Sequence, residues 1–392
     1  MTLARRAPLA GIASALVLAL GLTVPASATP RSAGAASAGT ARGADAALNR
    51  ALARLVRQPD GPPGIAVMVQ RGARAVLHRA GTANVATGAP IRASDSMRVA
   101  SVAKAFSGAV ALSLVAEGRL SLSDTVGRRL PGLPGAWSKV TLRELLQHTS
   151  GIPSFITKAF VKALAKSPHK APRPAVLLSF APKRLNFTPG SRYAYSNSDN
   201  IIVGLMVQAV TGKTYPSQLR ERVFAPLGLK DTSLPHGSAL PAPFVHGYKA
   251  APPQPPVDVT HEFAAGWTWA SGGVVSTPRD TNAFIRAYAR GATTSPVAHR
   301  AQFTFRPGSS EPPGPGQNSA GLAIFRYQTR CGTVYGHTGN TPGYTQFAAA
   351  TRDGSRSAVV SINSQITPHI NSDRFPELRR IYALAVCAAL AR

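Results

Sequence analysis

The sequence predicts a mixed α/β protein of the α+β kind, with an antiparallel sheet built from both chain ends and flanked by helices. Short runs of alternating apolar residues lie at residues 65–79 and 322–363, whereas residues 101–290 have a helical and loop-rich pattern. Strands from both ends can share one sheet when a helical region is inserted between them. We therefore expect one domain, made of two subdomains, over residues 44–392. Its sheet subdomain comprises residues 44–100 and 321–392, and its helical subdomain comprises residues 101–320.

The N-terminal segment has the pattern of an export signal. Two arginines precede an apolar run at residues 9–24, and a small-x-small sequence ends at Ala28. The run is shorter than the ~20 residues of a membrane-spanning helix, so a cleaved signal over residues 1–28 is favoured over an anchor. We expect cleavage after Ala28 and a secreted, soluble, monomeric protein without stable membrane insertion. Residues 29–43 lack apolar periodicity and are expected to form a flexible leader.

Strands and helices can be assigned in order along the chain. Helices are expected at residues 46–57, with Asp45 as the N-cap, and at residues 375–390. A turn at residues 71–73 joins the first two strands, and Asp353-Gly354 forms a later hairpin turn. Proline-rich residues 241–256 and 306–315 are expected to be surface loops, because proline removes backbone donors. The expected strands are residues 65–70, 74–79, 322–327, 333–337, 345–351 and 357–363.

Charge and metal-ligand patterns limit the classes of partner. The net charge of +28 would hold the protein near anionic polymers, including those of a cell wall. The alternative, which we prefer for any specific partner, is an arginine-rich composition spread over a solvated surface. No basic run alternates with aromatic residues as nucleic-acid grooves require, so nucleic acid is not an expected partner. His261-Glu262 begins like a zinc-binding helix, but Ala265 stands where the second histidine is needed. We expect no metal and no cofactor.

The first candidate motif is Ser101-Val102-Ala103-Lys104. The residues that follow, up to Glu117, are apolar on nearly every helical face, and Gly118 is a natural stop. Ser101 begins this helix, and Lys104 lies one turn later on the same face. A plain N-cap serine and a surface lysine are the alternatives. A lysine on a buried helix must be desolvated, however, and it persists only with partners or a lowered pKa. Ser101 is the obvious neighbour.

Two further motifs supply groups that could move a proton or hold a substrate. Tyr195 and Asn197 precede an apolar helix at residues 201–210, and their spacing lets both side chains point the same way in an extended segment. A tyrosine can relay a proton, and an amide can orient a lysine ammonium. The overlapping sequence Ser198-Asp199-Asn200 is interpreted as coincidence. His337-Thr338-Gly339 lies where a strand ends, and its glycines permit close backbone approach by a substrate.

The three motifs together resemble the serine β-lactamase and D-alanyl-D-alanine carboxypeptidase superfamily, in the branch with Tyr-x-Asn as the second motif. The resemblance covers nearly all of the chain after the signal, and residues 145–151 and 187–190 support it. It implies a β-lactamase/transpeptidase-like fold. Most β-lactamases of the superfamily have lysine where this chain has His337, whereas histidine there is similar to secreted DD-peptidases. The run from Cys331 and Gly332 to Gly339 resembles those DD-peptidases as well.

The resemblance implies acyl transfer in two steps. Ser101 attacks an amide or β-lactam carbonyl, Tyr195 and Lys104 take its proton and pass it to the leaving amine, and water hydrolyses the acyl-serine. Asn197 would hold Lys104, and the N–H groups of Ser101 and Asn340 would form the oxyanion hole. The residues implied to contact substrate are Thr338, Gly339, Asn340, Trp267 and Phe160. An exposed His337 would titrate near ~6.5, so binding of an anionic substrate should weaken above neutral pH.

The two cysteines of the chain, Cys331 and Cys387, are expected to form a disulfide in an oxidising compartment. It would join the last helix to a strand. Two free buried thiols are the alternative.

The chain also departs from the DD-peptidase pattern. Aligned on Cys331, it has Phe325 where those relatives have an arginine that grips the substrate carboxylate, and Arg326 should point to the opposite face. Asn340 replaces a hydroxyl residue. Four functions remain open: a DD-carboxypeptidase acting on cell-wall peptides, an esterase or D-amino-acid amidase acting on a small amide or ester, a β-lactamase, and a catalytically idle binder of β-lactams or cell wall. We place the carboxypeptidase first.

Overall fold

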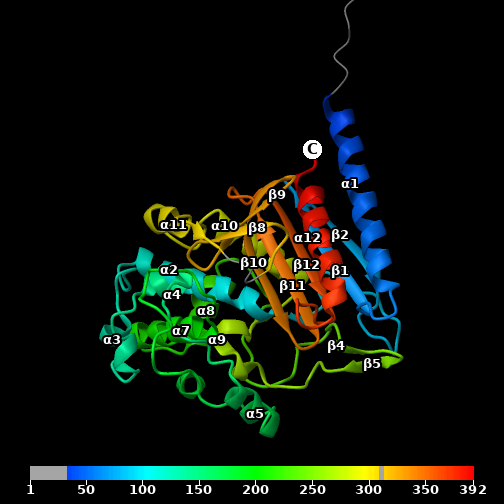
Figure 1. Cartoon of the computed structure of the whole chain (residues 1–392). Helices are drawn as coiled ribbons and strands as arrows, with labels where there is room; N and C mark the ends of the chain where they lie inside the picture. The colour runs from blue at the N-terminus through cyan, green and yellow to red at the C-terminus, as the bar shows by residue number, and fades with distance from the viewer. Residues whose placement is uncertain (1–32, 309–312) are drawn as a thin grey trace, which may run out of the picture.

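A computed structural model of the chain describes residues 33–308 and 313–392. Its sheet packs against two terminal helices on one side and against a helical region on the other (Figure 1). The expected signal at residues 1–28 and the start of the expected leader lie outside the described residues. The expected α+β architecture is confirmed.

Eight strands of the described chain form one antiparallel sheet in the order β2-β1-β12-β11-β10-β9-β8-β7. The N-terminal hairpin therefore pairs with a strand from near the C-terminus, as expected. Residues of β1 alternate between the two faces of the sheet: Val67 and Val69 face one apolar core, and Met68 faces the other. The strands are β1 (Gly64–Arg71), β2 (Arg74–Gly81), β7 (Arg306–Pro307), β8 (Gln317–Ala320), β9 (Phe325–Thr329), β10 (Gly332–Thr341), β11 (Tyr344–Ala350) and β12 (Arg356–Ile362).

Three strand boundaries differ from the expected ones. β7 and β8 extend the sheet before residue 321, so part of the expected helical subdomain belongs to the sheet. β9 begins at Phe325 rather than at residue 322. β10 continues through His337, Thr338 and Gly339 to Thr341, because the backbone of these residues pairs with β11. The third motif therefore lies within a strand and not at its end.

Helices α1 (Ala33–Val56) and α12 (Phe375–Leu390) cover one face of the sheet. The expected flexible leader is wrong for residues 33–43, which are helical; alanine-rich sequence has high helix propensity. Asp45 is consequently inside α1 and is not an N-cap; it accepts hydrogen bonds from Arg71 of β1. The apolar core on this side contains Leu48, Leu52, Leu55, Val67, Val69, Phe347, Val360 and Tyr382.

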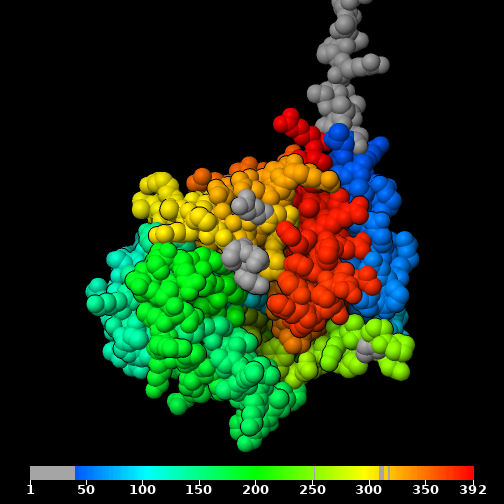
Figure 2. All heavy atoms as spheres, in the orientation of Figure 1, coloured from blue at the N-terminus to red at the C-terminus, as the bar shows by residue number. Residues whose placement is uncertain are grey.

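The other face of the sheet packs against α10 (Pro278–Ala289) and, beyond it, against the inserted region. Phe106 of α2 stacks on Phe284 of α10 with ring centroids 3.6 Å apart. This contact joins the helical region to the sheet, and Figure 2 shows the two parts lying side by side. The remaining α-helices are α2 (Ala103–Ala116), α3 (Val126–Arg129), α4 (Leu142–Gln147), α5 (Lys158–Lys166), α6 (Pro174–Leu177), α7 (Asn197–Thr211), α8 (Tyr215–Leu219), α9 (Trp269–Gly272) and α11 (Pro296–Gln302).

The proline-rich segment at residues 241–256 is only partly a loop. It contributes to a two-stranded hairpin formed by β4 (Tyr248–Ala251) and β5 (Gln254–Asp258). A two-stranded ribbon consists of edge strands, where a proline without an N–H group is tolerated. A second short pair joins β3 (Met97–Arg98) to β6 (Val275–Ser276) next to the start of the helical region.

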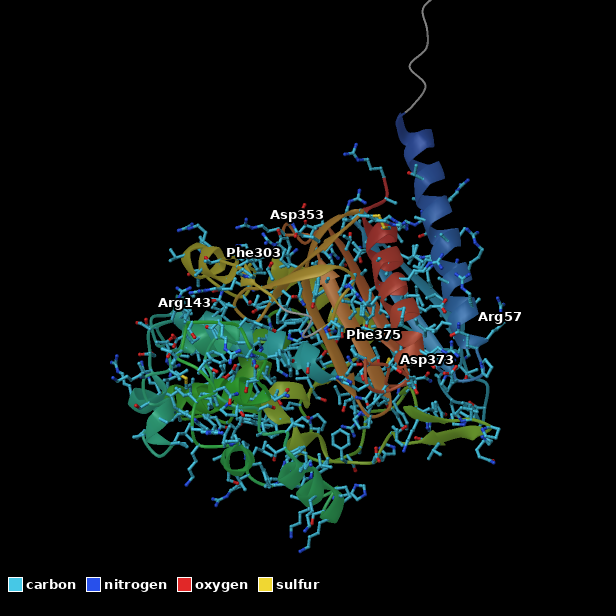
Figure 3. The ribbon with its side chains drawn as sticks, viewed as in Figure 1. Arg57, Arg143, Phe303, Asp353, Asp373 and Phe375 are labelled. Atoms are coloured by element: carbon cyan, nitrogen blue, oxygen red, sulfur yellow. A yellow bond between two sulfur atoms is a disulfide. The ribbon has the colours of Figure 1, made fainter. Side chains whose placement is uncertain are left out.

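The expected disulfide is present. Cys331, in the turn between β9 and β10, is bonded to Cys387 of α12, and the yellow bond lies near the C-terminal end of that helix (Figure 3). It therefore joins the last helix to the strand that carries the third motif. Within residues 33–308 and 313–392, no helix combines the length and the apolarity needed to cross a membrane.

Candidate active site

A cleft of about 820 Å³ lies where the start of α2, the start of α7 and the end of β10 meet. It brings together residues from all three sequence motifs. The predicted site residues that line it are Ser101, Phe160, Tyr195, Asn197, Trp267, Thr338, Gly339 and Asn340. Lys104 and His337 lie behind this surface, fully buried.

Lys104 lies in the first turn of α2, whereas Ser101 lies in the 3₁₀ turn Ala100–Val102 that leads into this helix and does not begin it. Its Nζ is 3.1 Å from Ser101 Oγ, 2.8 Å from Asn197 Oδ1 and 2.7 Å from the carbonyl oxygen of Ser271. Burial lowers the pKa of Lys104 to about 7, and the opposing effect of Asp199 is smaller. The Ser101 hydroxyl makes no capping bond to α2, since the helix has no side-chain cap. The expected serine-lysine pair is therefore present, with a lysine able to accept a proton near neutral pH.

Asn197 and Tyr195 reach Lys104 from the start of α7. Asn197 is the first residue of that helix rather than part of an extended segment, and its Nδ2 is 3.3 Å from Ser154 Oγ. The amide is thereby fixed with its oxygen toward Lys104. The Tyr195 ring lies with its centroid 4.9 Å from Lys104 Nζ, a cation–π distance that favours the charged lysine. The second motif therefore contacts the first through the lysine.

A buried pair of residues supports Tyr195 and was not predicted as part of the site. His148 Nδ1 lies 2.9 Å from Asp199 Oδ2, and Ser150 Oγ donates to Asp199 Oδ1 at 2.6 Å. The His148 ring is 4.5 Å from the Tyr195 ring. Burial raises the pKa of Asp199 well above its usual range and lowers the pKa of His148 well below its own, which favours an uncharged pair.

The surroundings of each residue single it out, but the sequence does not show that the two residues meet. His148 follows α4, whose start carries a complete capping box between Thr141 and Glu144, and it adopts the left-handed conformation with φ of 54°. Asp199 is a carboxylate in the first turn of an otherwise apolar helix. A charged group at such a position needs a partner, and His148 and Ser150 supply the hydrogen bonds.

His337 corrects an expectation. Its side chain is 0% exposed, and Nδ1 lies 2.5 Å from the carbonyl oxygen of Thr338, so this nitrogen carries the proton. Burial, with the charge of Lys104 as a second cause, lowers the pKa of His337 to about 3. The expectation of an exposed imidazole that binds an anion and titrates near neutral pH is therefore wrong.

The ring of Phe325 explains this burial. It contacts the His337 ring edge-to-face with centroids 5.0 Å apart, and Phe325 is itself 1% exposed. The adjacent Arg326 lies on the opposite face of β9, as expected, where it contacts Ser319 and the Phe305 ring. No guanidinium therefore takes the place of the arginine of DD-peptidases at this strand.

Gly339 lets β10 approach the backbone around Ser101. A Cβ atom at Gly339 would lie 2.4 Å from the carbonyl oxygen of Val99 and 3.0 Å from the Ser101 nitrogen. Only glycine fits there, which brings the N–H group of Ser101 close to the strand that contains Asn340. The Asn340 side chain accepts a hydrogen bond from Thr345 Oγ1 at 2.9 Å. This arrangement suits an oxyanion hole built from the two main-chain donors.

The walls of the cleft combine apolar side chains with polar ones, among them Gln365 and His369. Phe160 and Trp267 pack edge-to-face at 5.6 Å, as expected for cleft residues, and Trp267 Nε1 donates to Ser167. The other apolar side chains are Ile156, Val161, Leu164, Phe263 and Ile370. Among the described residues on the cleft surface, none is Asp, Glu, Lys or Arg. The described parts of the chain also contain no cluster of three or more His, Cys, Asp or Glu side chains that could hold a metal ion.

Comparison with known proteins agrees with this geometry. The family model for β-lactamase matches residues 52–382. The chain belongs to the β-lactamase family. This membership confirms the resemblance drawn from the three motifs.

Two solved structures of the family show what this member is similar to. The D-stereospecific amidohydrolase from Streptomyces sp. is 31% identical, with a TM-score of 0.73 over 82% of this chain and 94% of that chain. The penicillin binding protein from Bacillus halodurans, at 22% identity and a TM-score of 0.67 over 80% of this chain and 96% of that one, shares the fold.

Curated relatives of this family member match over part of their length. D-aminopeptidase from Brucella anthropi is 29% identical over 194 residues, which are 50% of this chain and 37% of that protein. Protein flp from Staphylococcus aureus strain MW2 is 29% identical over 176 residues, 44% of this chain and 34% of that protein. The chain thus spans little more than a third of these relatives.

Proposed function

We propose that the protein is an amidase or esterase that acts on derivatives of D-amino acids through an acyl-serine intermediate. The observation that carries this proposal is that the described cleft surface has no Lys or Arg side chain, and that Phe325, at the position of the carboxylate-binding arginine of DD-peptidases, is buried behind the cleft. A substrate with a free terminal carboxylate would find no Lys or Arg side chain on this surface to offset its lost hydration. A leaving group that ends in an amide or ester carries no such cost. The similarity to the D-stereospecific amidohydrolase supports the same choice.

The geometry accounts for the first chemical step. Lys104 in its neutral form accepts the Ser101 proton across 3.1 Å while Ser101 Oγ forms a bond to the substrate carbonyl carbon. The N–H groups of Ser101 and Asn340 stabilise the negative oxygen that develops. The C–N or C–O bond then breaks as the leaving group takes a proton through Tyr195.

Water completes the reaction by the reverse path. It attacks the acyl-serine carbonyl, gives its proton to the same lysine and tyrosine, and releases Ser101. Asn197 and the Ser271 carbonyl keep Lys104 Nζ in place through both steps. His337 is neutral throughout and acts by packing and hydrogen bonding rather than by charge.

Matched substrates test the proposal. Acetyl-D-Ala-D-Ala amide and the same peptide with a free carboxylate differ only at the group that an arginine would bind. We expect kcat/KM to be at least about tenfold higher for the amide, and Ser101→Ala to abolish both activities. A preference for the free carboxylate would restore the DD-carboxypeptidase assignment.

β-Lactams separate the remaining candidates. Long-lived labelling of Ser101 by a labelled penicillin indicates a penicillin-binding peptidase, and fast turnover of the label indicates a β-lactamase. For the proposed function we expect slow or no labelling together with cleavage of p-nitrophenyl esters.

We also propose that the protein acts outside the cytoplasm. The Cys331–Cys387 disulfide supports this, because disulfides persist in oxidising compartments. An exported protein whose N-terminal sequence begins at Thr29 is the expected product. An export host that retains the protein with Met1 at its N-terminus would contradict the proposal.

A further inference from the structure

A second cavity of about 270 Å³ adjoins the cleft. The two share Pro342, Gln365 and Ile370, so the second cavity continues the first. Its outer wall is the strand β4, and unlike the cleft it carries charged side chains, the exposed Lys249 and Glu262. Nothing in the reaction described above uses this cavity.

The framework around the cavity is firmly held. The main chain of Tyr248 donates to Asn363 at 2.9 Å, and its hydroxyl accepts from Val85 at 2.9 Å. A Cβ atom at Gly343 would lie 2.9 Å from the Cα of Gly247, so the β10–β11 turn packs directly against the segment before β4. The cavity is therefore part of the packed structure rather than a gap beside a loose hairpin.

Position along β10 decides which part of a substrate would reach this cavity. His337 lies next to Tyr195, with ring centroids 6.2 Å apart, and Gly339 lies against Ser101. Pro342, three residues further on, lines both cavities. The leaving group must lie near Tyr195 to receive its proton, so the acyl part extends the other way, toward Pro342. Three strand residues span ~10 Å, the length of two to three residues of extended peptide.

The described cleft surface carries no carboxylate that could pair with a free α-amino group. The carboxylate of Asp199 is fully buried behind the cleft, bonded to His148 and Ser150. A charged ammonium on the residue bound at Ser101 would therefore be desolvated without an opposite charge. An N-acylated residue carries no such charge, and its acyl part would continue along β10.

We propose that the second cavity is an acyl-side subsite that holds a peptidyl extension on the nitrogen of the residue bound at Ser101. The substrate class is then an N-acylated or peptidyl amide or ester with a polar group two to three residues before the scissile bond. A free D-amino acid amide is a poor substrate under this proposal. The inference rests on the proposed function, since it places the acyl group at Ser101.

Filling the cavity tests the subsite. Ala250→Trp on β4 places an indole in it, and Val257→Trp on β5 is the matched control, because Val257 is 53% exposed and does not line the cavity. The substrates are acetyl-Gly-Gly-D-Phe p-nitroanilide, D-Phe p-nitroanilide and p-nitrophenyl acetate. We expect the unmodified protein to prefer the long anilide over D-Phe p-nitroanilide by about tenfold or more in kcat/KM.

Ala250→Trp should lower kcat/KM for the long anilide about tenfold, mainly through a higher KM. Its kcat/KM for p-nitrophenyl acetate should stay within about twofold of the value for the unmodified protein. Val257→Trp should change neither. The subsite proposal is overturned if the unmodified protein cleaves D-Phe p-nitroanilide as well as or better than the long anilide. It is also overturned if Ala250→Trp keeps the same preference for the long anilide. Ester cleavage with no turnover of either anilide overturns it as well. Absence of all three activities would instead refute the proposed function.

Discussion

At the scale of single residues, burial determines the chemistry of the site. Lys104 and His337 are both 0% exposed, yet burial moves their titration to different ranges. The lysine retains three acceptors and a pKa of about 7, whereas the histidine, close to the lysine charge, has its pKa lowered to about 3. Only one of the two residues therefore changes charge near neutral pH.

The pH dependence of activity should report Lys104. The neutral lysine is the form that accepts the Ser101 proton, so kcat/KM for an ester should rise as pH increases through about 7 and level off above it. His337 is neutral across the range of about pH 5.5 to 8 and should add no inflection. Rates measured from about pH 5 to 9 for the unmodified protein and for His337→Asn check this. An inflection that disappears in His337→Asn would assign the titration to the imidazole.

At the scale of elements, two glycines of β10 have different tasks. A Cβ atom at Gly336 would lie 1.8 Å from the carbonyl oxygen of Ala348 on β11, whereas one at Gly339 would press on Val99 and Ser101. The first glycine therefore permits strand pairing, and the second permits the approach of the strand to the nucleophile. Gly336 is therefore needed for the structure of the sheet, and Gly339 for the geometry of the active site.

Alanine at these positions should separate stability from catalysis. Gly336→Ala should lower the free energy of unfolding by about 2–3 kcal/mol, the usual cost of overpacking. Gly339→Ala should lower kcat by roughly a hundredfold, since the two oxyanion donors are pushed apart. Denaturant unfolding and ester kinetics measure the two effects. Gly135→Ala is the control, because a Cβ atom there meets nothing within 4 Å. Full activity of folded Gly339→Ala would contradict the oxyanion assignment.

At the scale of the whole molecule, the positive charge is concentrated beside the cleft. Residues 145–198 contain no Asp or Glu. Lysines 158, 162 and 166 lie four residues apart on α5 and are exposed, while Phe160, Val161 and Leu164 of the same helix line the cleft. We therefore propose that an anionic polymer binds along α5, at the lower edge of the molecule in Figure 1.

Charge reversal on two helices tests this proposal. Replacing Lys158, Lys162 and Lys166 by Glu should make the protein elute from an anionic matrix at clearly lower salt. The matched control reverses Arg42 and Arg50 on α1 and Arg57 directly after it, the last of which points away from the body of the molecule in Figure 3. Equal shifts for both triple variants would show that net charge alone governs binding.

The sequence by itself indicated the α+β class and the pairing of Ser101 with Lys104, whereas it left the disulfide open against two free thiols. The pairing depends on local spacing, because serine and lysine are three residues apart and the apolar helix buries the lysine. The first residues of α1 were not predicted to be helical, and the reason is again local. They show no apolar periodicity, although their alanine content gives them a high helix propensity.

Only the tertiary structure decided the burial of His337, the contact between His148 and Asp199, and the second cavity. His337 is buried by Phe325 from another strand, Asp199 meets a histidine 51 residues away, and the cavity forms where β4 packs on the β10–β11 turn. Burial and pKa depend on neighbours that are distant in sequence. No pattern along the chain could therefore predict them.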